Sequence, residues 1–173
     1  MDTQYNTKCG TALNLLPHTL SHLQAHPEAA DLLGEAIGKI VIKEGQTFLL
    51  VEVEMGRVIG RSALVTASVV RTDESCLFAC RAGRNVPSRV VTGVEKPETS
   101  LFTVIAGKED DGSWALYTGF AGPSAEKEPT DGSLKGDNAK QIAFWSSHAL
   151  VWDESWETPF ESTWNQVCEK ATV

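Results

Sequence analysis

Short apolar segments, separated by glycines and charged residues, fill the middle of the chain from Lys39 to Phe120. Several of them alternate apolar and polar residues, which is the pattern of a half-buried strand. Tight turns between neighbouring segments favour antiparallel pairing, because parallel strands need a crossover of about a dozen residues or more. The sequence therefore predicts a mainly antiparallel sheet, with strands at residues 39–43, 48–54, 63–70, 75–81, 90–94, 101–107 and 114–120.

Helical patterns lie on both sides of this region. Residues 13–37 favour helix, and the second part of this stretch begins with Pro27 and Glu28, which are typical of a first helical turn. A polar stretch rich in glycine and proline, at 122–137, predicts a long loop, and Asn138 is placed to cap a helix over 139–147. We therefore expect an α+β fold in which N-terminal helices precede a curved, mainly antiparallel sheet, with one further helix before a last strand at 148–152.

The length of 173 residues suits a single domain. Within it we expect a helical N-terminal part at 1–38, a sheet-rich body at 39–152 and an acidic, aromatic tail at 153–173. The first residues lack the basic and apolar regions of a secretory signal, and no apolar run is long enough to cross a bilayer. We expect a cytoplasmic protein that does not bind membranes, with Cys9, Cys76, Cys80 and Cys168 as reduced core thiols.

Three arginines stand out because the formal net charge of the chain is −8. Arg81, Arg84 and Arg89 lie within residues 75–94, which contain no acidic residue, and Gly83 and Pro87 predict a tight turn between them. The planar guanidinium group suits recognition of a phosphate or a carboxylate. The stretch therefore predicts an anion site, and the alternative is an exposed loop whose arginines pair with acidic residues of the surface.

His148 is the only histidine outside the first 26 residues, and it lies where a helix is expected to pass into a strand. It is a candidate general acid or base, and the alternative is a half-buried side chain that is hydrogen-bonded to the backbone. Thr118 is a candidate for binding a phosphate oxygen, and Tyr117 and Thr118 are expected on opposite sides of their strand. Ordinary strand propensity is the simpler interpretation of both residues.

Two further patterns carry weaker predictions. His18, His22 and His26 have helical spacing and could hold a transition metal, but Pro17 and Pro27 leave little helix around them, so a polar helix face is the favoured interpretation. Arg57, in a turn, is a candidate addition to the basic site. We expect no metal site and no cofactor.

A succession of short motifs over residues 56–152 resembles the barnase, EndoU and RelE-like ribonuclease toxins. The motifs are Gly56-Arg-Val-Ile-Gly-Arg-Ser62, Cys80-Arg-Ala-Gly-Arg-Asn85 with Arg89, Leu116-Tyr-Thr-Gly-Phe-Ala-Gly122, Glu128-Pro-Thr-Asp131 and Phe144-Trp-Ser-Ser-His-Ala-Leu150.

This resemblance implies an endoribonuclease that needs no metal, in which the 2′-hydroxyl attacks the adjacent phosphate. It implies that His148 transfers a proton, that Arg81 and Arg84 stabilise the phosphate and that Thr118 orients an oxygen. Arg89, Arg57, Tyr117 and Trp145 would contact the substrate. A second proton carrier is required, and the sequence does not identify it.

Two other classes of function stay open. The acidic segments 109–111 and 153–161 are consistent with a non-enzymatic immunity- or antitoxin-like module that masks a basic protein partner, such as a cognate toxin. The arginines are equally consistent with a domain that binds a small organic anion. For the ribonuclease the partners would be an RNA substrate and a cognate inhibitor.

Overall fold

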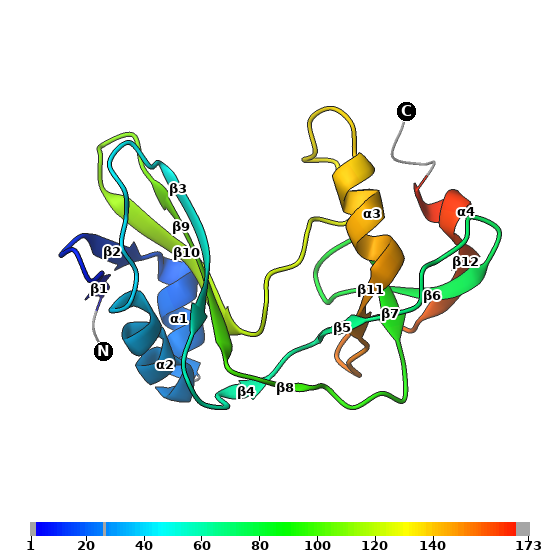
Figure 1. Cartoon of the computed structure of the whole chain (residues 1–173), viewed down its shortest axis with the longest axis horizontal. Coiled ribbons are helices and arrows are strands. Elements are labelled where there is room, and N and C mark those ends of the chain that lie inside the picture. The colour runs from blue at the N-terminus through cyan, green and yellow to red at the C-terminus, as the bar shows by residue number, and fades with distance from the viewer. Residues whose placement is uncertain (1–2, 26, 169–173) are drawn as a thin grey trace. The chain divides into compact units, whose positions relative to one another are not determined.

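The computed structural model describes residues 3–25 and 27–168. Cα packing divides the chain into two compact units, and each unit is built from two separate segments. The first unit comprises Met1–Arg61 and Glu98–Ser124, and the second comprises Ser62–Pro97 and Ala125–Val173. Both units contain helices and mostly antiparallel strands (Figure 1), which confirms the α+β class.

The first unit is a five-stranded sheet with helices α1 and α2 packed against it (Figure 1). The strand order is β1 (Gln4–Asn6), β2 (Ala12–Leu15), β10 (Trp114–Ala121), β9 (Leu101–Lys108) and β3 (Phe48–Glu54). Neighbouring strands are antiparallel, except that β2 and β10 are parallel. Helices α1 (Pro17–Ala25) and α2 (Pro27–Ile37) supply Leu23, Leu33 and Ile37 to the core. A short ladder of β4 (Gly60–Arg61) and β8 (Glu98–Thr99) completes the unit.

The start of the chain departs from the predicted order of elements. Residues 13–15 were expected to be helical, but they belong to β2, which pairs with β1 on one side and β10 on the other. Leu13 is fully buried there, so burial within a sheet overrides its preference for helix. Two strands therefore precede the helices. Helices α1 and α2 each begin at a proline, where the missing N–H would have had no helical partner.

The predicted strand at 39–43 is wrong, and so is its hairpin with 48–54. The Ile40 amide donates to the Ile37 carbonyl at the end of α2, and the Ile40 carbonyl accepts from Lys8 N. These bonds occupy the backbone groups that a strand would need, while the Ile40 side chain is buried in the core. The other predicted hairpin is confirmed. Strands β9 and β10 pair as expected, and Gly112 has a positive φ in the turn between them.

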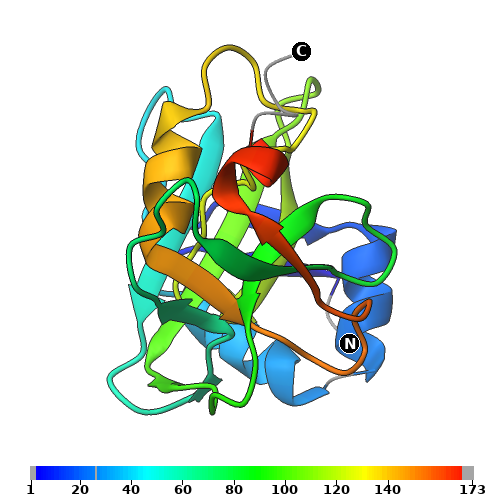
Figure 2. The same ribbon diagram turned by 90° about the vertical axis from the view of Figure 1, so that its right-hand side faces the viewer.

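The second unit is another five-stranded sheet, with α3 (Ala139–Ser147) and α4 (Trp164–Cys168). The strand order is β12 (Phe160–Thr163), β6 (Ser75–Cys80), β7 (Pro87–Val91), β11 (His148–Val151) and β5 (Leu64–Thr66). All pairs are antiparallel except β7 with β11. The core contains Phe78 and Leu150 together with Trp145 and Trp164, which come from α3 and α4 (gold and red in Figure 2).

The C-terminal part of this unit confirms α3 and adds elements after the strand that was expected to be the last. The predicted cap at Asn138 does not form by its side chain, because Asn138 Nδ2 donates to the Pro129 carbonyl. Asp137 Oδ1 accepts from the Ala139 amide in its place. Strand β12 and helix α4 follow β11, so the predicted tail is folded onto the sheet up to Cys168.

We predict that Gly119→Ala destabilises the first unit. A Cβ at this position would lie 2.8 Å from Leu33 Cδ1 and 2.9 Å from Phe102 Cε1, and both of those side chains are buried. Crowding in a packed core costs about 1–3 kcal/mol, which urea unfolding would measure. Gly38→Ala is the control, since its Cβ would make only an ordinary contact at 3.4 Å. Equal stability of the two variants would contradict the packing described here.

Candidate functional site

A buried carboxylate gathers two of the three predicted arginines in the second unit. Glu128 is 3% exposed, and its Oε1 accepts hydrogen bonds from Ser88 Oγ at 2.6 Å and from Arg81 Nη2 at 2.5 Å. Arg84 Nη2 lies 3.7 Å from Glu128 Oε2 and 3.8 Å from Asp131 Oδ2. We call these five residues the Glu128 cluster.

Local chain geometry explains how the cluster forms. Arg81 follows β6 directly, and the chain reverses at Gly83, which has a φ of 75° that glycine adopts without strain. The Arg84 amide donates to the Arg81 carbonyl at 2.9 Å, so both arginines belong to one tight turn, as Gly83 and Pro87 predicted. The reversal leads into β7, where the Ser88 side chain is fully buried beside Glu128.

Trp145 holds the loop that carries Glu128. Its indole Nε1 donates to the Glu126 carbonyl at 3.1 Å and to the Lys127 carbonyl at 2.9 Å. The ring is 1% exposed and packs in the core. The structure therefore gives Trp145 a supporting position behind the site, where a ligand could not reach its ring.

The cluster satisfies a group that would otherwise be costly to bury. A carboxylate removed from water needs both charge compensation and hydrogen bonds, and Glu128 receives them from Arg81 and Ser88. Both arginines remain partly exposed, with side-chain exposures of 36% for Arg81 and 43% for Arg84. The alternative prediction was that these arginines pair with acidic residues of the surface. They do pair with a carboxylate, but that carboxylate, Glu128, is buried.

His148 is held in one orientation at the start of β11. Its ring stacks on Phe144, with centroids 4.1 Å apart and planes 1° from parallel. Its Nδ1 lies 2.9 Å from the Phe144 carbonyl oxygen and 3.1 Å from Ser147 Oγ. A carbonyl only accepts, so Nδ1 carries the proton and Nε2 of the neutral ring has the free lone pair. No hydrogen bond to Nε2 is found within the described residues.

The register of β7 and β11 relates His148 to the cluster. The parallel pairs are Leu150 with Val90 and Val151 with Val91. His148 and Ser88 each lie two residues before the paired residues Leu150 and Val90, so this register aligns them. Residues two apart share a face of a strand, so both side chains lie on the face that carries Leu150. Neighbouring strands are about 4.8 Å apart. The imidazole and the Ser88–Glu128 pair therefore share one face of the sheet.

Arg89 has a different position from the other two arginines. Side chains alternate along a strand, so Arg89 lies on the opposite face from Ser88. Its Nη1 donates to the carbonyls of Trp145 and Ser146 at 3.3 and 3.1 Å, and its Nη2 donates to the Ser68 carbonyl at 3.1 Å. The predicted basic stretch is thus divided between two faces of one sheet.

The other predicted site residues belong to the first unit. Arg57 forms a double hydrogen bond with Glu35, which lowers the pKa of that carboxyl to about 2. A β-bulge interrupts the ladder between Leu116 and Thr118, at Tyr117. The structure therefore groups Arg81 with Arg84 in the second unit, and it places Arg57, Tyr117 and Thr118 in the first.

The bulge overturns the prediction that Tyr117 and Thr118 point to opposite sides. Thr118 lies opposite Ile105, so the two share a face, and Gly107 presents the same face two residues later. A Cβ on Gly107 would collide with the Tyr117 ring, so this ring also lies on that face. An extra residue in one strand shifts the alternation by one, which a simple period of two could not anticipate.

The bulged segment also borders a pocket of about 340 Å³ within the first unit. Thr19 Oγ1 donates to the Tyr117 carbonyl at 3.2 Å, and His18 Nε2 lies 3.3 Å from the same oxygen. His18 is the described member of the predicted histidine set, since His26 and the His22 side chain lie outside the described residues. No group of three His, Cys, Asp or Glu placed to hold a metal is found among the residues that the structure describes.

None of the described helices is long and apolar enough to cross a membrane. No family model, curated protein or solved structure matches this chain.

Sequence reasoning missed Ser88 and assigned no role to Glu128. Glu128 belonged to a motif that carried the resemblance, but nothing in its sequence neighbours distinguishes a buried carboxylate from an exposed one. The available signal was electrostatic, because a turn with two arginines and no acid of its own calls for an acidic partner elsewhere in the chain.

Cys9 corrects the prediction of four core thiols. All four cysteines are free, but Cys9 is exposed in the turn between β1 and β2. The Thr7 hydroxyl lies 3.2 Å from its sulfur and, with backbone and Thr11 contacts, lowers the pKa of the thiol to about 6. Burial raises the pKa of Cys168 to about 12.

We predict that Glu128→Ala destabilises the second unit by about 2–3 kcal/mol, because it leaves Ser88 Oγ and Arg81 without their acceptor. Arg84→Ala should cost less than about 1 kcal/mol, since this partly exposed side chain makes only the longer contacts. Urea unfolding of both variants measures the difference. An equal loss would show that the short Ser88 and Arg81 bonds do not dominate the cluster.

We predict that Cys9 is the first thiol alkylated by iodoacetamide, with a rate that is half-maximal near pH 6. The thiolate reacts, so a lowered pKa moves the rise in rate to lower pH. Peptide mapping after brief labelling across pH 5–9 identifies the site. Thr7→Val removes the largest stabilising contact and should move the midpoint to higher pH. An unchanged midpoint in this variant would contradict the assigned cause.

Proposed function

We propose that the second unit is a metal-independent endoribonuclease. In the proposed reaction the 2′-hydroxyl of one nucleotide attacks the adjacent phosphorus and loses its proton, while the 5′-oxygen of the next nucleotide leaves and gains one. A 2′,3′-cyclic phosphate and a free 5′-hydroxyl result. This reaction needs one group to accept a proton, one to donate a proton, and cations beside the phosphate.

The short contact between His148 Nδ1 and the Phe144 carbonyl oxygen is the observation that carries the proposal. Because Nδ1–H donates to the Phe144 carbonyl, the Nε2 lone pair is directed away from that bond and is ready to take a proton. Stacking on Phe144 restricts rotation of the ring. A proton carrier held this way loses little orientational freedom when a substrate binds.

The Glu128 cluster supports the proposal with the second proton carrier that the sequence lacked. Arginine stays protonated and cannot be a base, whereas a carboxylate can. Glu128 Oε1 is occupied by Ser88 and Arg81, while Oε2 accepts no hydrogen bond within the described part of the chain and faces Arg84 at 3.7 Å. We assign proton transfer jointly to His148 and Glu128.

Arg81 and Arg84 would contact the phosphate through their remaining N–H groups. A guanidinium has five N–H donors, and only one hydrogen bond, from Arg81 Nη2, joins these two side chains to the carboxylate. A phosphate approaching the turn would therefore meet unused donors on partly exposed side chains. The overall charge of −8 repels RNA in general, so we expect cleavage of a narrow set of substrates.

The proposed roles of Thr118, Arg57 and Tyr117 rest on the sequence analysis alone. These residues lie in the first unit, and Arg57 is engaged by Glu35. The chemistry assigned to His148, Glu128, Arg81 and Arg84 does not depend on them.

The test is incubation of the full chain with total tRNA in EDTA, with fragments checked for 2′,3′-cyclic phosphate ends. We expect His148→Ala to lower the cleavage rate by about 100-fold or more, because a general acid or base contributes that much. Glu128→Gln should also be impaired while it keeps an acceptor for Ser88. Arg71→Ala is the matched control, since Arg71 is an exposed arginine of the same unit that pairs with Asp73.

Similar decay with wild type and all three variants would rule out this site. Cleavage that requires added Mg²⁺ would contradict the metal-independent reaction. Fragments with 3′-hydroxyl ends would contradict attack by the 2′-hydroxyl.

A further inference from the structure

Arg89 differs from four other arginines because no carboxylate of the described residues lies in direct contact with it, although the charge of Glu74 acts on it from a greater distance. Arg57, Arg71, Arg81 and Arg84 each lie within 4.0 Å of a carboxylate oxygen. Arg89 has no carboxylate at that distance among the described residues, and its three hydrogen bonds all go to neutral carbonyls. The side chain is half-buried, and burial lowers its pKa, although a guanidinium stays charged. A half-buried charge that no carboxylate contacts directly is costly.

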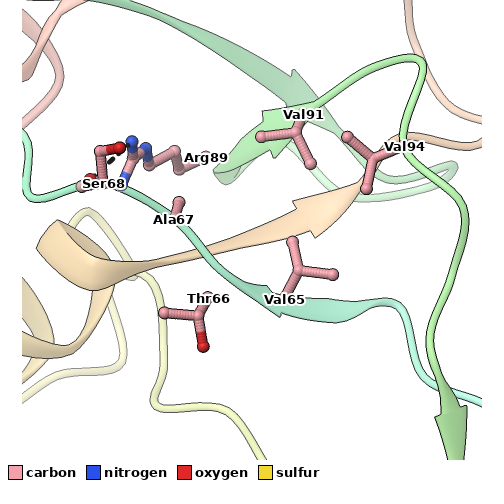
Figure 3. A pocket seen from close by; sticks show the side chains of 7 residues that line it. All are labelled: Val65, Thr66, Ala67, Ser68, Arg89, Val91 and Val94. Atoms are coloured by element: carbon pink, nitrogen blue, oxygen red, sulfur yellow. Dashed lines mark hydrogen bonds between the residues drawn. The ribbon is translucent and has the colours of Figure 1, made fainter.

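An open pocket of about 590 Å³ lies beside this charge and is lined by Val91, which shares a face of β7 with Arg89, and by residues of β5 and the chain after it. Figure 3 shows Val65, Val91 and Val94 turned toward one another, with Arg89 at the other end of the pocket beside Ser68. Ala67 and the valines form an apolar wall, and Thr66, Ser68 and Arg89 complete the lining. An apolar wall with one convergent charged group is the usual composition of a small-molecule site.

The unused donors of Arg89 indicate the chemistry of the ligand. Three of the five guanidinium N–H groups are bonded, which leaves Nε–H and one Nη2 N–H with no acceptor in the described residues. Two N–H groups of one planar fork match the two oxygens of a carboxylate. The valines suit a ligand with an apolar body. They offer no hydrogen bonds to replace the water around a phosphate, so a phosphate is disfavoured.

We infer that this pocket binds a small monocarboxylate with a branched apolar body, held by Arg89 at the acid group and by the three valines at the other end. The site is separate from the proposed ribonuclease centre, because Ser88 and His148 lie on the other face of the sheet. Binding at this pocket does not depend on the proposed ribonuclease activity.

A purely structural role for Arg89 makes a different prediction. The guanidinium donates to two carbonyls at the end of α3, where a positive charge stabilises the helix, and it tethers Ser68. In that role its substitution would lower stability, and the chain would not distinguish a carboxylate from an uncharged ligand of the same shape.

The experiment titrates the ¹⁵N-labelled full chain with 4-methylpentanoate and follows amide shifts by NMR. We expect saturable shifts at the pocket residues, and binding about tenfold or more weaker for 4-methylpentanamide, which has the same shape without the charge. Arg89→Gln should abolish the difference between acid and amide. Arg71→Gln, which changes an exposed arginine elsewhere in the unit, should leave it intact.

Val94→Asp tests the pocket without disturbing Arg89. Val94 is 48% exposed, so the variant is expected to fold, and its carboxylate should repel the ligand and weaken binding about tenfold or more. Equal binding of acid and amide, or no saturable binding of the acid, would overturn the inference. Arg89-dependent binding of inorganic phosphate without binding of 4-methylpentanoate would overturn the choice of a carboxylate.

Discussion

The ion pair between Glu128 and Arg81 organises the second unit around a charge that is removed from water. A buried carboxylate determines its own surroundings, because each of its partners must be held within hydrogen-bonding distance. The turn after β6, the start of β7 and the loop before α3 are all fixed by that requirement. Trp145 adds a second tie to the loop through the carbonyls of Glu126 and Lys127. The same arrangement leaves arginine donors at the surface beside a carboxylate.

The two faces of the second sheet carry different chemistry because one strand supplies both. Ser88 and Arg89 are neighbours in β7, and the alternation of side chains sends one to the Glu128 cluster and the other to the valine pocket. A basic stretch that looks continuous in the sequence is therefore divided between two faces of the sheet. Neighbouring residues of a strand point to opposite faces, whereas residues two apart share a face.

The sequence was informative wherever local chemistry decides the outcome. Pro27 and the apolar stripe after it located α2, and Asp110 to Gly112 located the turn between β9 and β10. It was misleading where distant partners decide. Leu13 pairs with Trp114 of β10, which comes about 100 residues later, and the backbone of Ile40 is hydrogen-bonded to a helix end and to Lys8. For the site, Arg81 and His148 were visible as residue types, but Glu128 gained its significance only from burial.

The two units are interleaved along the chain, and this affects synthesis. The first unit takes its central strands, β9 and β10, from Glu98–Ser124, after an entire segment of the second unit has been made. A growing chain must therefore hold β3 and both N-terminal helices without their sheet partners until about residue 121 leaves the ribosome. No single cut in the chain can release either unit intact. A shortened form of this protein should therefore contain incomplete sheets, because each unit needs two separate segments of the chain.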